Sequence, residues 1–360
     1  MSERAGDGEL DEAKRDAFAA RMVAVLNGAA LALMTSIGRQ TGLFEVMAGM
    51  APSTSEEIAT AARLDERYVR EWLGAMVTGG IVEFDPARRT YLLPREHAAV
   101  ITKAAGPRNM ARFMQYIPML GEVEADVIES FRRGGGVPYE RYPRFQKLMA
   151  ESSGLRFDHL LLQKVVPLTG LGDALASGID VLDIGCGQGH AINLLARAFP
   201  RSRFTGYDFS ADGIAAAEAE SRALGHANVR FAVRDVAALD EAGRYDLVTA
   251  FDVIHDQAKP ADVLREVALA LRPDGTLLMV DVRASSELQD NVAHPLGPFL
   301  YGMSTMHCMT VSLALEGAGL GTVWGEQKAL AMLREAGLTR VDVHRLADDP
   351  LNNYYVARKG

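Results

Sequence analysis

The stretch Val181–His190, which reads VLDIGCGQGH, decides the fold. An apolar run ends in alternating glycines, a pattern that predicts a strand, a tight turn and a helix beginning near His190. Gly185, Gly187 and Gly189 let the chain turn sharply and let a ligand approach the backbone. A dinucleotide fingerprint would have a glycine where His190 stands, so the spacing here is D-x-G-x-G-x-G.

Acidic residues follow this strand pattern at three places. Asp183 lies at the end of the first strand and suits a cationic group better than a pyrophosphate. Asp208 ends the segment RFTGYD, where a carboxylate can accept both hydroxyls of a ribose. Its alternative role is a helix N-cap, which Ser210 could fill instead. Asp235 follows VRFAV, where an adenine amino group could be recognised.

Strands and helices alternate from about residue 168 onward. Strands are predicted at IDVLDI, RFTGYD, VRFAV, YDLVTAF and GTLLMVDV, with helical segments between them. This alternation predicts a parallel sheet with helices on both faces. The last two strands, TRVDVHRL and NYYVARKG, are separated by only a few residues and must therefore be antiparallel. Ligands bind such sheets beyond the carboxyl ends of the strands.

The composition is that of a soluble globular protein with two domains. The 360 residues are 48% hydrophobic and 24% charged, and the net charge of −9 works against DNA as the main partner. No uninterrupted apolar run reaches the ~18 residues of a membrane span, and the acidic N-terminus lacks the apolar core of a signal peptide. We therefore expect no membrane association and a cytoplasmic location. Cys186 and Cys308 lack a metal or disulfide spacing.

The N-terminal part predicts a winged-helix domain over residues 17–95, after a disordered tail over residues 1–16. Thr54 and Glu57 form a capping-box pattern, and Asp65 is a candidate N-cap. The helix after Asp65 is expected to present Tyr68, Trp72, Leu73 and Met76 on one face. A hairpin follows in IVEFDPARRTYLL. Residues 1–95 carry 11 Lys and Arg against 14 Asp and Glu, so dimerisation or covering a substrate is favoured over DNA binding.

Residues 96–165 predict a helical linker that is rich in aromatic residues. Most of these side chains are expected to form a helical core. Tyr139 and Phe145 follow the glycine-rich segment RRGGGVPYERYP, where a flexible cover over a pocket would lie.

These features together resemble the class I S-adenosylmethionine-dependent methyltransferases. The resemblance covers about residues 165–360 and rests on LDIGCGQG, YDFS, RDV, LRPDGTLLMVD and the C-terminal hairpin. It implies a Rossmann-like α/β domain over residues 166–360, with a seven-stranded sheet that ends in an antiparallel hairpin. With the winged helix, the layout is similar to plant-type small-molecule O-methyltransferases. It is closer to the mycobacterial Rv2258c-like family, because GGGVPY, IHDQ and HCMTVSLALEGAGLGTVWG resemble features of that family.

The resemblance implies S-adenosylmethionine as the cofactor and S-adenosylhomocysteine as its product. Asp183, Gly185 and Gly187 would hold the methionine part and Asp208 the ribose. Asp235 and Val236 would hold the adenine, and Phe251 and Asp252 would lie beside the sulfonium. The other candidate cofactor-binding residues are Cys186, Gly189 and Phe209.

The apolar stretch AFDVIHDQ ends at His255 and Asp256, which are candidates for proton transfer. Histidine suits this chemistry because its unperturbed pKa lies near 6.5. The plant-type motif has its catalytic base at the matching histidine, although this chain continues as HDQAKP where the plant motif has a tryptophan. Asp256 would orient His255 or cap the loop. The alternative is that His255 only packs at the end of the strand.

An insertion over about residues 283–325 is a candidate lid over a hydrophobic acceptor. His294, Met303 and His307 are candidate substrate-pocket residues, together with Tyr139 and Phe145. Packing roles are the alternative for His307 and Met303. The pair His307–Cys308 lacks a third ligand at a recognisable spacing, so no metal is expected.

The resulting hypothesis is a homodimeric enzyme that methylates a small, largely apolar molecule. Oxygen is the expected acceptor atom. Transfer to nitrogen, carbon or sulfur by proximity alone stays open, because such acceptors need less help from a base. The alternative from another class is a cofactor-binding winged-helix regulator without catalysis.

Overall fold

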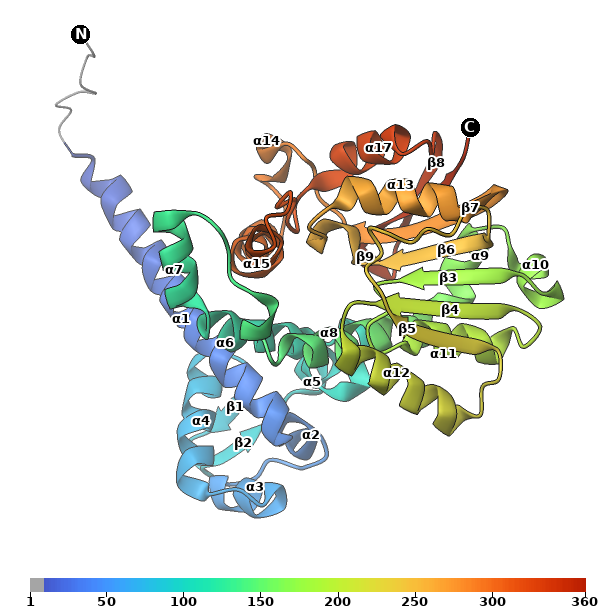
Figure 1. Ribbon diagram of the computed structural model, residues 1–360. Coiled ribbons are helices and arrows are strands. Elements are labelled where there is room, and N and C mark those ends of the chain that lie inside the picture. Colours follow the sequence, from blue (N-terminus) through green and yellow to red (C-terminus); the bar gives the residue numbers. More distant parts are fainter. Residues whose placement is uncertain (1–9) are drawn as a thin grey trace, which may run out of the picture. The chain divides into compact units, whose positions relative to one another are not determined.

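The computed structural model describes residues 10–360 and contains two compact units, Met1–Pro118 and Met119–Gly360. Unit 1 has the helices and the hairpin expected of a winged helix (Figure 1). Its elements are α1 (Glu12–Thr41), α2 (Leu43–Ala48), α3 (Ser55–Ala62), α4 (Glu66–Thr78), β1 (Glu83–Asp85), β2 (Thr90–Leu92), α5 (Arg95–Ile101), η1 (Lys103–Arg108) and η2 (Met110–Gln115).

The predicted helix caps of unit 1 are confirmed. Thr54 accepts a hydrogen bond from the backbone N–H of Glu57, and the Glu57 carboxylate accepts one from the N–H of Thr54. Asp65 accepts hydrogen bonds from the backbone at the start of α4. These contacts satisfy backbone donors that have no partner within their own helix.

The core of unit 1 is built around Trp72. Its ring lies 5.4 Å from the ring of Phe44, and its Nε1–H donates to the carbonyl oxygen of Met34 at 2.8 Å. Leu73 and Met76 are fully buried beside it. The prediction that Tyr68 shares this buried face is wrong, because Tyr68 is 80% exposed and Val69 occupies the buried position.

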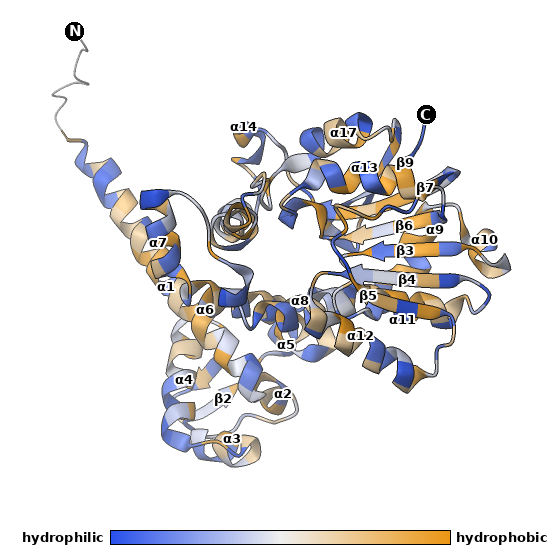
Figure 2. Cartoon of the chain, in the orientation of Figure 1, coloured by the Kyte–Doolittle hydropathy of each residue, from blue (hydrophilic) through white to orange (hydrophobic). Residues whose placement is uncertain are grey.

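Helix α1 differs from the sequence prediction in two ways. It begins at Glu12, capped by Asp11, so part of the predicted disordered tail is helical, while residues 1–9 lie outside the described residues. Its outer surface is apolar, and Figure 2 shows most of α1 in the colours of hydrophobic residues. Among the described residues, α1 alone is long and apolar enough to cross a membrane by length and composition. The expectation of no segment of this length and composition is therefore wrong, although helices of soluble proteins meet the same two criteria.

Unit 2 contains a seven-stranded sheet, as predicted. The strand order is β5-β4-β3-β6-β7-β9-β8. The first five strands are parallel, β9 is antiparallel to β7, and β8 is antiparallel to β9. The strands are β3 (Asp180–Ile184), β4 (Arg203–Asp208), β5 (Val229–Val233), β6 (Tyr245–Phe251), β7 (Leu271–Val282), β8 (Arg340–Leu346) and β9 (Asp349–Arg358).

Successive residues of the central strands are buried on opposite faces of the sheet. Val181 and Leu247 pack with α11 (His190–Ala198) on one face. Leu182 and Val248 pack with α13 (Pro260–Ala270) and α17 (Gly325–Glu335) on the other (Figure 1). Because both faces are buried, ligand chemistry has room only at the strand ends.

The remaining helices of unit 2 connect the strands or precede them. The predicted linker, residues 96–165, contributes to both units, and its second half forms a long helical segment before the sheet. The helices are α6 (Tyr116–Gly121, which begins in unit 1), α7 (Glu124–Arg133), η3 (Tyr139–Arg141), α8 (Phe145–Arg156), η4 (Phe157–Val165), α9 (Val166–Leu168), α10 (Gly172–Ser177), α12 (Ala211–Leu224), η5 (Ile254–Asp256), α14 (Leu288–Asn291), α15 (Gly297–Met303), η6 (Ser304–Cys308) and α16 (Met309–Ala314).

The buried centre of the sheet gives a stability prediction. Leu182→Ala removes a fully buried side chain from β3, and we expect it to lower the free energy of unfolding by about 2–5 kcal/mol. Val233→Ala, at the half-exposed end of the edge strand β5, should change it by less than about 0.5 kcal/mol. Urea unfolding followed by circular dichroism measures both. Equal effects of the two substitutions would contradict this account of the core.

Candidate functional site

At two positions of the glycine loop after β3, only a glycine fits. Gly185 has φ +61°, and a Cβ atom there would lie 2.5 Å from a methyl group of Val253. Gly189 has φ +74°, and its Cβ would lie 2.6 Å from the Cβ of Ala217 and 2.8 Å from the ring of Phe231. The loop therefore presents bare backbone at the carboxyl edge of the sheet.

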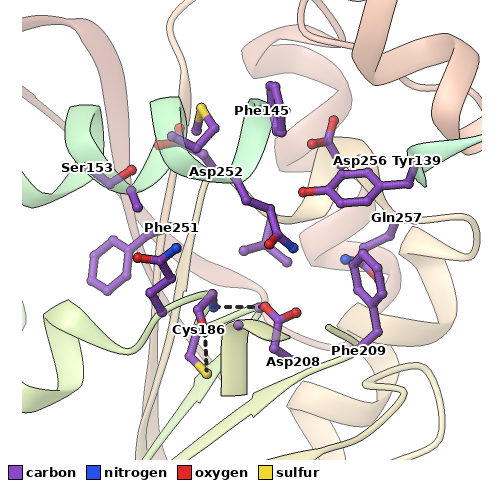
Figure 3. A pocket seen from close by; sticks show the side chains of 18 of the residues that line it. Tyr139, Phe145, Ser153, Cys186, Asp208, Phe209, Phe251, Asp252, Asp256 and Gln257 are labelled. Atoms are coloured by element: carbon purple, nitrogen blue, oxygen red, sulfur yellow. Dashed lines mark hydrogen bonds between the residues drawn. The ribbon is translucent and has the colours of Figure 1, made fainter. Parts of the chain in front are cut away.

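A cavity of about 530 Å³ lies beyond this loop. In Figure 3, Tyr139, Phe209 and Asp256 lie on one side of it, and Ser153 and Phe251 on the other. Most of the predicted cofactor residues line it: Asp183, Gly185, Cys186, Gly187, Asp208, Phe209, Asp235, Val236, Phe251 and Asp252. Gly189 does not line the cavity; it is the last residue of the loop and the N-cap of α11, and it packs against Ala217 and Phe231.

The predicted substrate-pocket residues divide into two groups. Tyr139 and Phe145 line the cavity, and the ring of Tyr139 meets that of Phe209 edge-on at 5.5 Å. His294, Met303 and His307 do not line it. His294 accepts a hydrogen bond from the backbone of Leu296. Met303 is buried within α15, and His307 is buried behind Phe145. From the insertion, the cavity is lined instead by Val311, Ala314 and Leu315.

Helix α8 forms a wall of the cavity that the sequence analysis did not assign. Its lining residues recur every three or four positions, which places them on one helical face. They are Phe145, Gln146, Met149, Ala150, Ser153 and Gly154, and Phe157 continues the face into η4. This spacing was present in the sequence, but it cannot distinguish a helix facing a cavity from one facing a core. Gln146 also donates to Ser210 at 2.9 Å, which connects α8 to the start of α12.

Asp183 is 2% exposed at the base of the cavity. Its carboxylate accepts a hydrogen bond from the hydroxyl of Thr249 at 2.6 Å. Burial raises the pKa of Asp183 to about 7, and the nearby carboxylate of Asp208 adds to the shift. A cation beside Asp183 would therefore stabilise its ionised form.

Asp208 is held by the glycine loop. Its Oδ2 accepts from the N–H of Gly187 at 2.8 Å, and its Oδ1 accepts from the N–H of Ser210 at 2.8 Å. Ser210 caps α12 by accepting from Gly213, so Asp208 is not the N-cap. Its carboxylate is thus fixed at the cavity wall, where each oxygen can accept a further hydrogen bond.

Asp252 forms a nearly buried ion pair with Arg156 of α8. Nη2 of Arg156 donates to Oδ2 of Asp252 at 2.6 Å, and the two side chains are only 13% and 9% exposed. Burial raises the pKa of Asp252, while the Arg156 guanidinium opposes this shift. Asp252 also has φ +57°, a strained conformation for a residue with a side chain. The pair therefore joins the cavity wall formed by α8 to the end of β6.

His255 lies behind the cavity lining and is 4% exposed. Its Nδ1 is 2.8 Å from Oδ1 of Asp281, at the end of β7. Its Nε2 is 3.2 Å from Oδ1 of Asp256, without hydrogen-bond geometry. Burial acts to lower the pKa of His255, but Asp281 and Asp256 outweigh it and raise this pKa well above its usual value. Asp281, which the sequence analysis missed, therefore occupies the orienting position considered for Asp256.

Two family comparisons match the two units. Residues 29–103 match the Rv2258c-like winged HTH domain, and residues 175–337 match a methyltransferase domain. Together with the seven-stranded sheet, they place the chain among the class I S-adenosylmethionine-dependent methyltransferases, with an Rv2258c-like winged helix that precedes the methyltransferase domain in the sequence. S-adenosylmethionine is the cofactor of this class.

Curated relatives match only part of this chain. An arsenite methyltransferase of Aquipseudomonas alcaligenes is 34% identical over 128 residues, which cover 33% of this chain and 37% of that protein. A fatty-acid O-methyltransferase of Mycolicibacterium smegmatis is 31% identical over 113 residues, which cover 31% of this chain and 40% of that protein. The chain thus spans less than half the length of these two relatives.

Solved structures match the chain over nearly its whole length. A putative O-methyltransferase from Nostoc punctiforme has a TM-score of 0.70 at 18% identity, covering 94% of this chain and 98% of its own. Mitomycin 7-O-methyltransferase has a TM-score of 0.69 at 20% identity, covering 96% and 99%. Human N-acetylserotonin methyltransferase in complex with its cofactor has a TM-score of 0.62 at 16% identity, covering 99% of both chains. At these identities the likeness establishes the fold.

The raised pKa of Asp183 predicts pH-dependent cofactor binding. Only the ionised carboxylate attracts a cationic group, so affinity should rise with pH through about 7 and level off above it. Titration calorimetry should find S-adenosylmethionine bound roughly tenfold more weakly at about pH 6 than at about pH 8. Asp183→Asn should bind weakly at both pH values. A pH-independent affinity of the unaltered protein would contradict this role of Asp183.

Proposed function

We propose that this protein transfers the methyl group of S-adenosylmethionine to an oxygen atom of a small, largely apolar molecule. The observation that carries the proposal is the cavity, where the glycine loop and the acidic strand ends meet a wall of aromatic and aliphatic side chains. Its volume of about 530 Å³ is within the range of small-molecule sites. The O-methyltransferases among the structural neighbours support oxygen as the acceptor atom.

In this proposal the cofactor lies along the carboxyl edge of the sheet. Asp183, Gly185 and Gly187 hold the methionine part. Asp208 receives the ribose hydroxyls, Asp235 and Val236 face the adenine, and Phe251 and Asp252 lie beside the sulfonium. The position of all these residues on one cavity supports the assignment. When bound, the cofactor supplies an activated methyl group, and the protein's part is alignment and exclusion of water.

The acceptor is proposed to lie against Tyr139, Phe145 and the α16 residues that line the same cavity. These side chains come from α8, from the segment before it and from the insertion. The largely apolar character of this wall favours an acceptor with few charged groups. A hydroxyl acceptor must also lose its proton to become nucleophilic.

We assign the removal of this proton to His255. With Nδ1–H donating to Asp281, the lone pair of a neutral imidazole would be on Nε2, the nitrogen on the side of Asp256. Asp256 lines the cavity, so Nε2 lies one side chain away from it. The two carboxylates favour the protonated ring, but a cation in the cavity would oppose them and release the proton. Asp281 is thus a positioning residue for His255.

This assignment predicts that His255→Gln lowers kcat by about 10²–10⁴-fold while S-adenosylmethionine binding is unchanged. Asp281→Asn should lower kcat by a smaller factor. Release of S-adenosylhomocysteine would be measured with a panel of small phenols and fatty acids as acceptors. His97→Gln, an exposed histidine of unit 1, is the control. Unchanged turnover of His255→Gln with intact cofactor binding would remove His255 from the mechanism and favour a nitrogen, carbon or sulfur acceptor.

We also propose that the protein is a homodimer that buries the apolar surface of α1. Phe18, Met22, Val25 and Leu26 are 48–70% exposed along this helix, a large apolar area for a surface in contact with water. A second copy of the chain would cover the same surface on both partners.

We further propose a cytoplasmic location. The two cysteines are free thiols, which supports a reducing compartment such as the cytoplasm.

Light scattering tests the dimer directly, since the expected mass is that of two chains. The double substitution Phe18→Asp and Leu26→Asp should weaken dimerisation by on the order of 10²-fold, because it places charge in the buried surface. Tyr68→Asp, at a still more exposed position of α4, should leave the mass unchanged. A single-chain mass would disprove the dimer, and sedimentation of the unaltered protein with lipid vesicles would show that α1 binds a membrane instead.

A further inference from the structure

The insertion brings a third polar group to His255 and Asp256. Cys308, at the end of η6, is 4% exposed and lies 52 residues further along the chain than Asp256. One ring nitrogen of His255, one carboxylate oxygen of Asp256 and the Sγ of Cys308 all lie within 4.8 Å of one another. The sequence could not reveal this cluster, because no local spacing connects the two segments.

Imidazole, carboxylate and thiolate are the side-chain groups that bind zinc in proteins. Ligand atoms at about 2.0–2.3 Å from one tetrahedral ion are about 3.6 Å apart. Since these atoms lie within 4.8 Å of one another, each pair has to approach by about 1.2 Å at most. Nε2 and the Asp256 oxygen are already 3.2 Å apart.

Asp281 gives His255 the arrangement of a metal ligand. Metal-binding histidines usually donate their other ring N–H to a carboxylate, which fixes the tautomer and the ring orientation. The contact between Nδ1 of His255 and Asp281, at 2.8 Å, has this geometry and leaves Nε2 for the cluster. Asp281 is itself completely buried, so this carboxylate is held rigidly in place.

Polar atoms without a hydrogen-bond partner lie in and beside the cluster of His255, Asp256 and Cys308. Oδ1 of Asp256 is buried without a hydrogen-bond partner among the described residues. The adjacent His307 is fully buried, and within residues 10–360 neither of its ring nitrogens has a partner. Buried polar atoms without partners cost about 1–3 kcal/mol each, so their concentration here indicates a missing ligand.

We propose that His255, Asp256 and Cys308 form a binding site for a zinc-like divalent cation. Three protein ligands leave one coordination position open, and Asp256, one of the three, also lines the cavity. Binding replaces the S–H bond of Cys308 by a metal–sulfur bond and the N–H bond of a protonated Nε2 of His255 by a metal–nitrogen bond, and both protons pass to solvent.

This inference goes beyond the proposed methyl transfer. Nε2 of His255 cannot hold a metal ion and accept a proton at the same time. The metal-bound protein is therefore the inactive form of the proposed enzyme, and removal of the ion restores the base.

Cobalt is the probe for this site, because a cysteine thiolate bound to Co²⁺ gives a charge-transfer band in the near ultraviolet. The full-length protein, stripped with a chelator, is titrated with Co²⁺ and then with Zn²⁺. We expect one equivalent of metal per chain, a band that saturates at this ratio, and its loss in Cys308→Ser. Cys186→Ser, which removes the other thiol of the chain, should keep the band.

Asp256→Asn and Asp281→Asn provide tests that do not remove the thiol. The first should weaken zinc binding by at least tenfold, and the second by about 10–100-fold. Circular dichroism and S-adenosylmethionine binding verify that each variant is folded. No cobalt band in the unaltered protein, or a band lost in Cys186→Ser and kept in Cys308→Ser, would overturn the proposal and leave a protonated His255 between two carboxylates.

Metal binding is measured without any acceptor, so its failure and the failure of the proposed methyl transfer are separate results. In an assay with an active acceptor, one equivalent of zinc should lower kcat at least tenfold, and a chelator should restore it. Cys308→Ser should be much less sensitive to zinc. Turnover that zinc does not change would overturn the competition for Nε2.

Discussion

The structure depends above all on the burial of both faces of the parallel sheet. Helices cover each face, so a polar side chain on a central strand can reach a ligand only where the strand ends. Parallel strands end at the same edge, and this gathers Asp183, Asp208 and Asp281 from β3, β4 and β7 although they are far apart in sequence. Charges are costly to bury, which explains why each of these carboxylates is held by hydrogen-bond donors.

The second constraint is the ion pair between Arg156 and Asp252. The pair is buried, so removal of either partner would leave an uncompensated charge and would cost about 3–5 kcal/mol. It fixes the C-terminal end of α8 at the cavity, while Gln146 attaches the N-terminal end to Ser210. Helix α8 is thereby tied at both ends to the strand ends that carry the proposed cofactor residues. A π-helical segment, η4, follows directly, as is common near functional sites.

The sequence predicted the sheet because its pattern is local. The five parallel strands and the closing hairpin could be recognised from apolar runs, glycine turns and acidic strand ends. The partner of His255 could not be predicted in this way. In the sequence, Asp281 is a single acidic residue in an apolar strand. Only the pairing of β6 with β7 brings its carboxylate to the imidazole of His255. Tyr68 was misplaced because a helical pattern identifies an apolar face without giving its edges, and Val69 fits the core better.

The environment of His255 connects the proposed chemistry with the proposed metal site. Two carboxylates and a thiol in a buried space favour a positive charge there, and three species can supply it. In the two proposals, a proton on His255 would give the resting state, a cationic cofactor in the neighbouring cavity would drive that proton away, and a divalent ion would replace it. The proton and the divalent ion exclude each other at Nε2. The insertion contributes Cys308 and so distinguishes this arrangement from a simple histidine–carboxylate pair, because the thiol adds a third potential metal ligand.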